Sequence, residues 1–163
     1  TGIYNRRYFE QKQEEAYRHW KRTSRKSTLV MIDIDHFKEI NDCYGHAVGD
    51  RVLVALAEFI GAQLRPLDLF FRLGGEEFAL LLYETTADQA ALLSERLRRH
   101  FEAGSLDGVL PAFTISCGVA ELPEHGSLSA WLEQSDEAMY AAKRAGRNRV
   151  VVAPPSEERG DTA

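Results

Sequence analysis

Apolar residues recur along the chain with two different periods, and these periods predict the secondary structure. Helical spacing of apolar positions, as in Phe9, Ala16, Tyr17 and Trp20, predicts amphipathic helices. Short runs rich in β-branched residues, as in STLVMIDID, predict strands. The predicted elements are helix 5–25, strand 27–35, a short helix after residue 35, a loop at 43–50, helix 52–64, a β-hairpin at 68–82, helix 87–101, strand 112–122, helix 128–145 closed by Gly146, and strand 149–153.

The order of these elements predicts the fold class. Strands and helices are mixed without regular β-α-β alternation, which favours an α+β fold with a mostly antiparallel sheet of about five strands covered by helices. A ferredoxin-like or polymerase-palm arrangement fits best, with the hairpin at the centre of the sheet. We expect one domain over residues 1–153, followed by a polar, Pro-led tail at 154–163 that is disordered.

Composition and charge narrow the class of protein. The 163 residues include 44% hydrophobic and 28% charged residues, as in soluble globular proteins, and the net charge of -5 argues against a nucleic-acid-binding protein. Cys43 and Cys117 lack Cys-x-x-Cys spacing, so we expect no zinc site and a reducing compartment. With no membrane-length apolar run and no secretory signal, we expect a cytoplasmic domain without direct membrane contact. Because the chain starts at Thr1, we expect it to be a piece of a longer protein, whose own membrane attachment stays open.

Carboxylates gather at the ends of two predicted strands. Side-chain alternation places Asp33 and Asp35 on the same face of their strand. Glu76 and Glu77 follow the Gly-Gly turn of the hairpin on opposite faces, so that only one of them can align with Asp33. Carboxylates from two strands suit Mg²⁺, which takes one or two protein carboxylates together with substrate phosphates. The alternative is that these acids are simply solvated at strand ends.

The segment after the first strand suggests phosphate binding. We expect Asp35 to cap the short helix, whose free N–H groups favour anions. Lys38 in the first turn is unfavourable for the helix dipole, and a phosphate partner would explain its position; otherwise it is exposed and pairs with a nearby acid. Asn41 and Asp50 flank the glycine-containing loop and could contact a guanine edge, although both residue types are common in turns.

Several motifs together resemble one known family. They are TGIYNRRYF, DIDHFKEINDCYGHAVGD, RLGGEEFALLL, TISCGVA and DEAMYAAKRAGRNRV, in the expected order. The chain resembles the GGDEF domain of diguanylate cyclases, with the signature in its GGEEF form at residues 74–78. Members of this family condense two GTP molecules into cyclic di-GMP with release of pyrophosphate, so the resemblance implies a nucleotidyltransferase.

The resemblance assigns roles to the carboxylates. It implies that Asp33, the backbone carbonyl of Ile34 and Glu76 bind Mg²⁺, with Mn²⁺ as an alternative ion. Glu77 would be a second metal ligand or an orienting residue. Glu76 would also accept the proton of the attacking ribose hydroxyl. Bound metal would neutralise the charge that develops on the phosphoryl oxygens.

The resemblance also implies a GTP pocket built from separate stretches. Asn41 and Asp50 would read the guanine, with His46 beside them. The phosphates would be held by Phe37, Lys38, Lys143 and Arg147. Without the resemblance, the last two would be explained as ordinary cations at a helix end.

A second ligand site is implied by RPLD at 65–68, which matches the product-inhibition motif of the family. Arg65 would bind a guanine edge and a phosphate of cyclic di-GMP, and Asp68 would contact the guanine. Arg96 matches a secondary inhibitory arginine that reaches over from a partner domain. The alternative for RPLD is an i,i+3 ion pair within a turn.

The expected partners follow from the chemistry. One domain offers one GTP pocket, yet the product contains two equivalent bonds, so we expect two copies to meet about a two-fold axis in a transient homodimer. Cyclic di-GMP is expected as product and inhibitor. Three other interpretations remain open: an inactive GGDEF-like receptor for cyclic di-GMP or GTP, a palm-type enzyme acting on other nucleotides, and a structural dimerisation domain.

Overall fold

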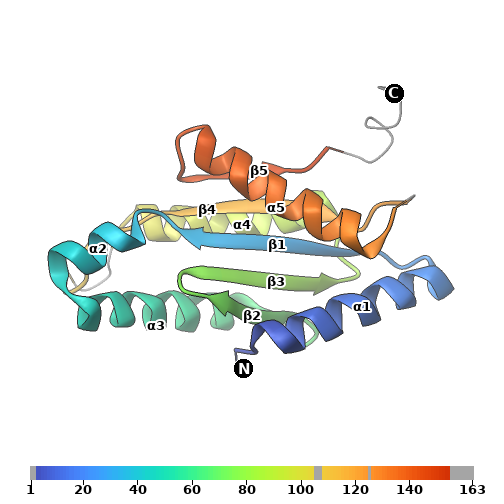
Figure 1. Ribbon diagram of the computed structural model, residues 1–163, viewed down its shortest axis with the longest axis horizontal. Helices are drawn as coiled ribbons and strands as arrows, with labels where there is room; N and C mark the ends of the chain where they lie inside the picture. The colour runs from blue at the N-terminus through green and yellow to red at the C-terminus, as the bar shows by residue number, and fades with distance from the viewer. Residues whose placement is uncertain (1–2, 105–107, 125, 155–163) are drawn as a thin grey trace.

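The chain folds around one five-stranded sheet (Figure 1). The computed structural model describes residues 3–104, 108–124 and 126–154. Its helices are α1 (Arg6–Thr23), α2 (Phe37–Tyr44), α3 (His46–Gln63), α4 (Ala87–Glu102) and α5 (Leu128–Arg144). Its strands are β1 (Ser27–Ile34), β2 (Leu69–Gly74), β3 (Glu77–Tyr83), β4 (Ile115–Glu121) and β5 (Arg149–Val152). The tail that we expected to be disordered lies, from residue 155 onward, outside the described residues.

The strand order is β2-β3-β1-β4-β5, and only the β4–β5 pair is parallel. This confirms the expected α+β, mostly antiparallel sheet. The expectation of a central hairpin is wrong, because β1 is the central strand and β2 lies at the edge. All eight residues of β1 are buried, whereas β2 exposes Arg72. A strand that is buried on both faces belongs in the interior of a sheet, and one with an exposed cation is suited to its edge.

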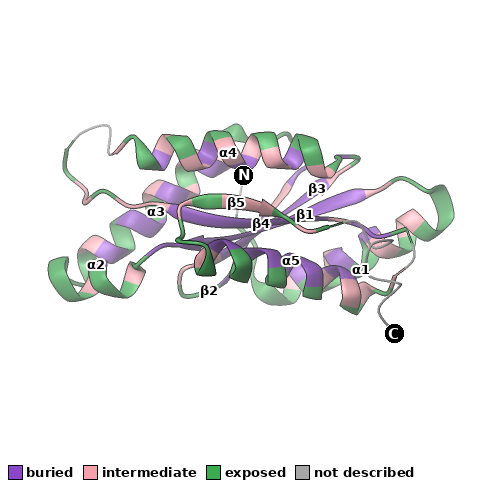
Figure 2. Cartoon of the chain, turned by 90° about the horizontal axis from the view of Figure 1, so that it is seen from above, coloured by how far each residue is buried: buried purple, intermediate pink, exposed green. Residues whose placement is uncertain are grey.

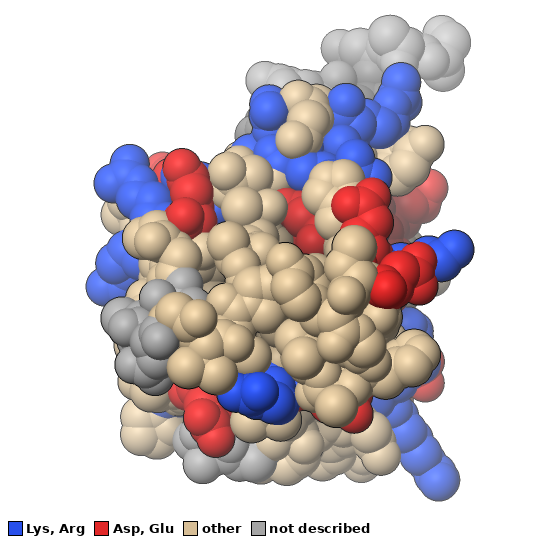
Figure 3. Space-filling model, turned by 90° about the vertical axis from the view of Figure 1, so that its left-hand side faces the viewer, with Lys and Arg blue, Asp and Glu red and all other residues tan. Residues whose placement is uncertain are grey.

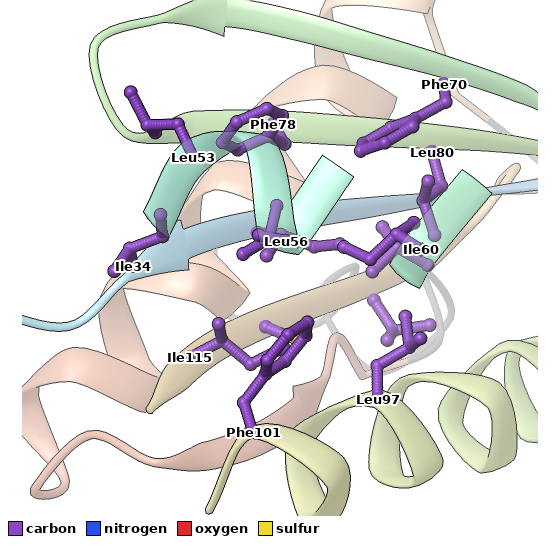
Figure 4. Packing of buried hydrophobic residues seen from close by; sticks show 14 of the residues in the cluster. Ile34, Leu53, Leu56, Ile60, Phe70, Phe78, Leu80, Leu97, Phe101 and Ile115 are labelled. Carbon is purple, nitrogen blue, oxygen red and sulfur yellow. The ribbon is translucent and has the colours of Figure 1, made fainter. Parts of the chain in front are cut away.

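Helices cover both faces of the sheet, and Figure 2 shows the buried residues of the strands between them. One hydrophobic cluster joins α3 and α4 to the sheet. Figure 4 shows its centre, in which Leu56 of α3 and Phe101 of α4 lie near Ile34 and Ile115. The second cluster joins α1 and α5 to the opposite face, through Phe9, Trp131 and Met139 over Leu29 and Met31. The two clusters account for the helical and strand periodicities of the sequence.

The connection between α2 and α3 is much shorter than predicted. We expected a loop at 43–50 and a helix from residue 52, but α2 runs to Tyr44 and α3 begins at His46. Gly45 alone separates the two helices, with φ 90° and ψ 160°. A positive φ is readily available to glycine, so one residue is sufficient to turn the chain sharply. Apart from Gly45, the residues predicted as loop therefore lie on two helices that contact each other.

Helix α5 lies unusually close to β4 because Gly118 has no side chain. A Cβ atom at this position would lie 2.2 Å from the Met139 backbone nitrogen and 2.6 Å from the Ser135 carbonyl oxygen. This close approach fixes the height of α5 over the sheet, and the last turn of α5 carries Lys143. Within the described residues, none of the helices combines the length and the apolar character needed to cross a bilayer.

Candidate active site

Four segments meet at one end of the sheet, at the left of Figure 1. They are the end of β1, the β2–β3 turn, the α2–α3 corner and the α5–β5 connection. The antiparallel register pairs Asp33 with Glu77, and the Ile34 amide donates to the Glu76 carbonyl oxygen at 3.3 Å. From α5, the Lys143 Nζ atom lies 2.6 Å from Asp33 Oδ2. Residues separated by more than 100 positions thus share one small region.

The hairpin turn explains how two adjacent glutamates are accommodated. Gly74 pairs with Glu77 across the hairpin, so the turn consists of Gly75 and Glu76. Gly74 and Gly75 have φ values of 152° and 48°, and the Arg72 guanidinium donates two hydrogen bonds to the Gly75 carbonyl oxygen at 2.8 and 3.1 Å. Glu76 therefore lies in the turn itself, not in the strand. The prediction that only one glutamate aligns with Asp33 is confirmed, and that residue is Glu77.

The buried Asp33 carboxyl lies in a field of opposing charges. Burial raises its pKa to about 6, the hydrogen bond and charge of Lys143 oppose the rise, and Glu76 and then Glu77 add to it. Glu76 acts on Asp33 more strongly than Glu77 does, although Glu77 is its partner in the register. Glu77 and Lys143 also line a cavity of about 320 Å³ together with Asp136. Arg6 also lines this cavity, so two cations, Arg6 and Lys143, accompany the carboxylates Glu77 and Asp136 there.

The oxygen ligands at this end of the sheet suit Mg²⁺ that is bound jointly by protein and substrate, rather than a metal bound by protein ligands alone. The described residues contain no group of three or more His, Cys, Asp or Glu side chains arranged to hold a metal. Asp33, Glu76 and the Ile34 carbonyl supply hard oxygen atoms, and Mg²⁺ uses one or two such carboxylates together with water and substrate phosphates. The residues therefore fit an ion that binds together with a nucleotide.

Asp35 has a different role from the one that we expected. Its carboxylate accepts hydrogen bonds from Thr114 Oγ1 at 2.7 Å, Ser116 Oγ at 2.7 Å and the Asn148 backbone N–H at 2.9 Å. The expected helix cap is wrong, because the N-cap residue of α2 is His36, whose φ is 55° and whose side chain makes no capping bond. Asp35 is engaged by β4 and the α5–β5 connection and so cannot also cap α2.

The α2–α3 corner brings Asn41 against Gly49. A Cβ atom at Gly49 would lie 1.9 Å from Asn41 Oδ1, so the Asn41 amide occupies space that only glycine leaves free. Asp50 follows Gly49 and is exposed, as is His46 at the start of α3. Gly49 was not among the predicted site residues; the only sequence signal was its position directly before Asp50.

The first turn of α2 is accessible to an anion. Lys38 is exposed and Phe37 is half-buried at the start of the helix. Because His36 provides no side-chain cap, the first amide N–H groups of α2 are left for another acceptor. The expected phosphate site is therefore open in the structure, while contact with a phosphate stays a prediction.

The second cationic segment follows α5. Lys143 contacts Asp33, whereas the exposed Arg147 guanidinium has no hydrogen-bonding or ionic partner in the described part of the chain. Figure 3 views this end of the molecule: basic atoms gather at the top of the view, where the α5–β5 connection lies, with acidic atoms below them. The structure therefore brings a cationic rim next to the carboxylates of the sheet.

Comparison with known proteins identifies the fold. A family model described as "Diguanylate cyclase, GGDEF domain" matches residues 1–149. The chain belongs to the GGDEF family. Diguanylate cyclase DgcM of Escherichia coli K12 is 44% identical over 153 residues, which are 94% of this chain and 37% of DgcM. The chain spans about two fifths of the length of the curated relatives that it matches.

Solved GGDEF structures confirm the architecture. The GGDEF domain of DgcB from Caulobacter crescentus, solved in complex with c-di-GMP, gives a TM-score of 0.88 at 35% identity, covering 94% of this chain and 92% of that one. The active GGEEF domain of a diguanylate cyclase from Vibrio cholerae gives a TM-score of 0.88 at 33% identity, covering 95% of this chain and 100% of that one. These likenesses extend over nearly the whole GGDEF domain described here.

The RPLD segment of this GGDEF domain forms a tight ionic turn between α3 and β2. Asp68 accepts hydrogen bonds from the Arg65 backbone N–H at 2.8 Å and from Arg65 Nη2 at 2.9 Å. The same Nη2 atom donates to Thr85 Oγ1 at 2.9 Å. The Asp68 side chain is 4% exposed, and that of Arg65 is 56% exposed. The i,i+3 ion pair that we considered as an alternative is therefore present, and it holds Arg65 with its guanidinium facing solvent. Arg96 lies exposed on a different element, α4.

Proposed function

We propose that residues 1–153 form the catalytic domain of a diguanylate cyclase, which converts two GTP molecules into cyclic di-GMP and two pyrophosphate molecules. The observation that supports this most is the meeting of Asp33, Glu76 and Lys143 at the end of the sheet, next to the α2–α3 corner. The names of the relatives support the same activity. These relatives are longer than this chain, and we propose that this domain carries the activity that their names state.

The reaction requires each GTP to act as nucleophile and as electrophile. The 3′-hydroxyl oxygen of one GTP forms a bond to the α-phosphorus of the other, the bond from that phosphorus to the bridging oxygen breaks, and pyrophosphate leaves with the electron pair. Mg²⁺ held by Asp33, Glu76 and the Ile34 carbonyl would neutralise charge on the phosphoryl oxygens. Glu76 accepts the proton of the attacking hydroxyl, and Glu77 orients the site from the first position of β3.

The remaining predicted residues position the nucleotide. Asn41 and Asp50 contact the guanine, with His46 beside them. The phosphates are held by Phe37, Lys38, Lys143 and Arg147. Positioning and electrostatic stabilisation supply most of the acceleration in phosphoryl transfer, so a rigid arrangement of these groups is as important as their identity.

A direct assay tests the proposed activity. The domain at high concentration, with Mg²⁺ and GTP, should form cyclic di-GMP and pyrophosphate in a 1:2 ratio, measured by chromatography and a coupled phosphate assay. EDTA should abolish the reaction and added Mn²⁺ should restore it, while ATP should give no cyclic product. Absence of product from a domain that still binds cyclic di-GMP would favour the receptor function instead.

Turnover should depend on the meeting of two domains. Because one pocket binds one GTP, the two bonds of the product require two copies related by a two-fold axis. Specific activity should therefore fall on dilution and recover when the domain is fused to a dimeric coiled coil. Specific activity that is independent of enzyme concentration, for a monomer verified by light scattering, would contradict the two-domain mechanism.

Gly49→Ala should weaken GTP binding by displacing the Asn41 amide. The new methyl group would overlap Asn41 Oδ1, so the amide must rotate away from the guanine. We expect KM for GTP to rise about five- to tenfold, as for the loss of a buried hydrogen bond, with a smaller change in kcat. The control is Asn41→Ala, which makes room for the methyl group: in that background Gly49→Ala should have no further effect. Equal effects in both backgrounds would refute this explanation.

Arg65→Ala should relieve inhibition by the product. Asp68 orients the Arg65 guanidinium towards solvent, where it can donate charge-assisted hydrogen bonds to cyclic di-GMP. Loss of such bonds should raise the inhibitory concentration of added cyclic di-GMP at least about tenfold. Arg25→Ala is the matched control, because Arg25 is another exposed arginine in an ion pair, with Glu84 at 2.7 Å. Full inhibition of the Arg65 variant would exclude this site.

A further inference from the structure

We infer that Asp35 and Arg98 are positioning residues for the phosphate-binding Arg147, on which they act through Asn148. This inference rests on the proposed function, because it gives Arg147 a nucleotide phosphate as its ligand. Asp35 and Arg98 are themselves engaged by protein groups. Both hold the short α5–β5 connection from which the Arg147 side chain projects.

The backbone of this connection has an unusual conformation. Gly146, Arg147 and Asn148 have φ values of 120°, 65° and 46°, so three successive residues are in the left-handed region. Residues with a Cβ atom rarely adopt this region, and two of the three are not glycine. Such a conformation persists when the surroundings determine it, and it often occurs where a side chain must be aimed.

Asp35 holds this conformation from the sheet. Its Oδ2 atom accepts the Asn148 backbone N–H at 2.9 Å, and its two oxygens also accept the Thr114 and Ser116 hydroxyl groups at 2.7 Å each. Asp35 is buried, with 4% of its surface exposed, and its position is therefore set by β4. Only Ile34 separates it from Asp33 in the sequence, so the end of β1 and the residue that follows it reach both the predicted metal site and the Arg147 connection.

Arg98 holds Asn148 through its side chain, whereas Asp35 holds it through its backbone. The Asn148 Oδ1 atom accepts a hydrogen bond from Arg98 Nη1 at 2.9 Å, and its Nδ2 atom donates to Glu102 Oε2 at 3.3 Å. Arg98 is itself held by Glu95 at 2.6 Å and also by Glu102, and its side chain is only 13% exposed. Asn148 thus makes three hydrogen bonds, two with residues of α4 and one with Asp35, which directly follows β1, so the connection is tied to two separate elements.

Arg147 has no such support of its own. Its side chain is exposed, and within the described ranges no protein group binds its guanidinium. The backbone of the connection, which Asp35 and Arg98 hold, therefore sets the point from which this side chain leaves the chain, while the guanidinium itself is held by no described protein group. A cation that starts from a fixed point and has no internal partner is available to an external anion.

Two neighbouring arginines of α4 provide a matched test. Arg98 and Arg99 both form ion pairs with Glu95, but only Arg98 reaches Asn148. We expect Arg98→Ala to raise the Kd for GTP in the presence of Mg²⁺, and KM in the turnover assay, about five- to tenfold, and Arg99→Ala to leave both unchanged. Thermal melts of each variant show whether the fold is retained.

A double-mutant cycle separates positioning from general stability. If Arg98 acts through Arg147, then Arg98→Ala added to Arg147→Ala should weaken GTP binding no further, although its effect on the melting temperature should remain. Asp35→Asn, which cannot accept all three hydrogen bonds, should show the same coupling if it folds. The inference would be overturned if the effects of the two substitutions on the Kd for GTP were additive. It would also be overturned if either Arg98→Ala or Arg147→Ala alone left GTP binding unchanged. The proposed activity would be refuted by a wild-type domain that binds GTP but forms no product. In that case the double-mutant cycle would still test the positioning inference, because it compares Kd values for GTP and needs no turnover.

Discussion

Replacement of Glu76 by glutamine should lower kcat for cyclic di-GMP formation by about a thousandfold, the size of effect seen when one group that stabilises charge in a transition state is removed. The substitution keeps the shape of the side chain but removes its negative charge and its ability to accept the hydroxyl proton. Glu76 is the proposed metal ligand and proton acceptor, whereas Glu77 is proposed to orient the site, which is the reason for expecting the larger effect at Glu76.

Glu77→Gln is the matched comparison for that experiment. Both glutamates belong to the same hairpin and are partly exposed, but Glu76 lies in the turn and Glu77 begins β3 opposite Asp33. We expect a loss of about ten- to a hundredfold for Glu77→Gln, as for an orienting residue. Initial rates measured over a range of Mg²⁺ concentrations would compare the two variants, and retained binding of cyclic di-GMP would show that each is folded. A deeper loss for Glu77→Gln would make the register partner of Asp33 the main metal ligand.

Gly118→Val should destabilise the domain by about 3 kcal/mol or more, at the upper end of overpacking effects. The atoms that a new Cβ would meet at 2.2 and 2.6 Å belong to the backbone of α5, so no change of rotamer can relieve the overlap. The helix would have to move away from β4, which would also move Lys143 away from Asp33. Any folded fraction should therefore have reduced activity as well.

Urea unfolding followed by circular dichroism measures this effect. Ala141→Val is the control, because it adds the same branched side chain to the exposed face of α5 and should cost less than about 1 kcal/mol. Gly118→Ala should fall between the two. A Gly118→Val domain as stable as the parent would show that the α5–β4 contact is softer than its geometry indicates.

The elements of the fold could be predicted from sequence because each depends on nearby residues. The run from Ser27 to Ile34 is apolar enough for a strand at any position, and the period of the α5 sequence favours a helix whatever it packs against. The failures occurred where the outcome depends on distant partners. The α2–α3 corner was predicted as a loop because Gly45 and Gly49 are typical of loops, but Gly49 is required by the Asn41 side chain that packs against it.

The candidate site shows the same division. The sequence alone indicated a group of carboxylates at two strand ends, because residue type and strand alternation are local properties. Strand alternation could not separate Asp33 from Asp35, because it places both on the same face of the predicted strand, and only the resemblance to a family singled out Asp33. The difference lies in their partners: Lys143 contacts Asp33, while Asp35 is occupied by β4 and Asn148.

By itself, then, the sequence determined the order of helices and strands, the class of sheet and the chemical groups available for binding a metal and phosphates, since periodicity and residue type decide these locally. Only the tertiary structure decided that β1 is the central strand, that Glu77 faces Asp33, and that Asp35 anchors a connection 113 residues away in the sequence. Register and side-chain partnership arise from packing between distant segments, and no local pattern contains that information.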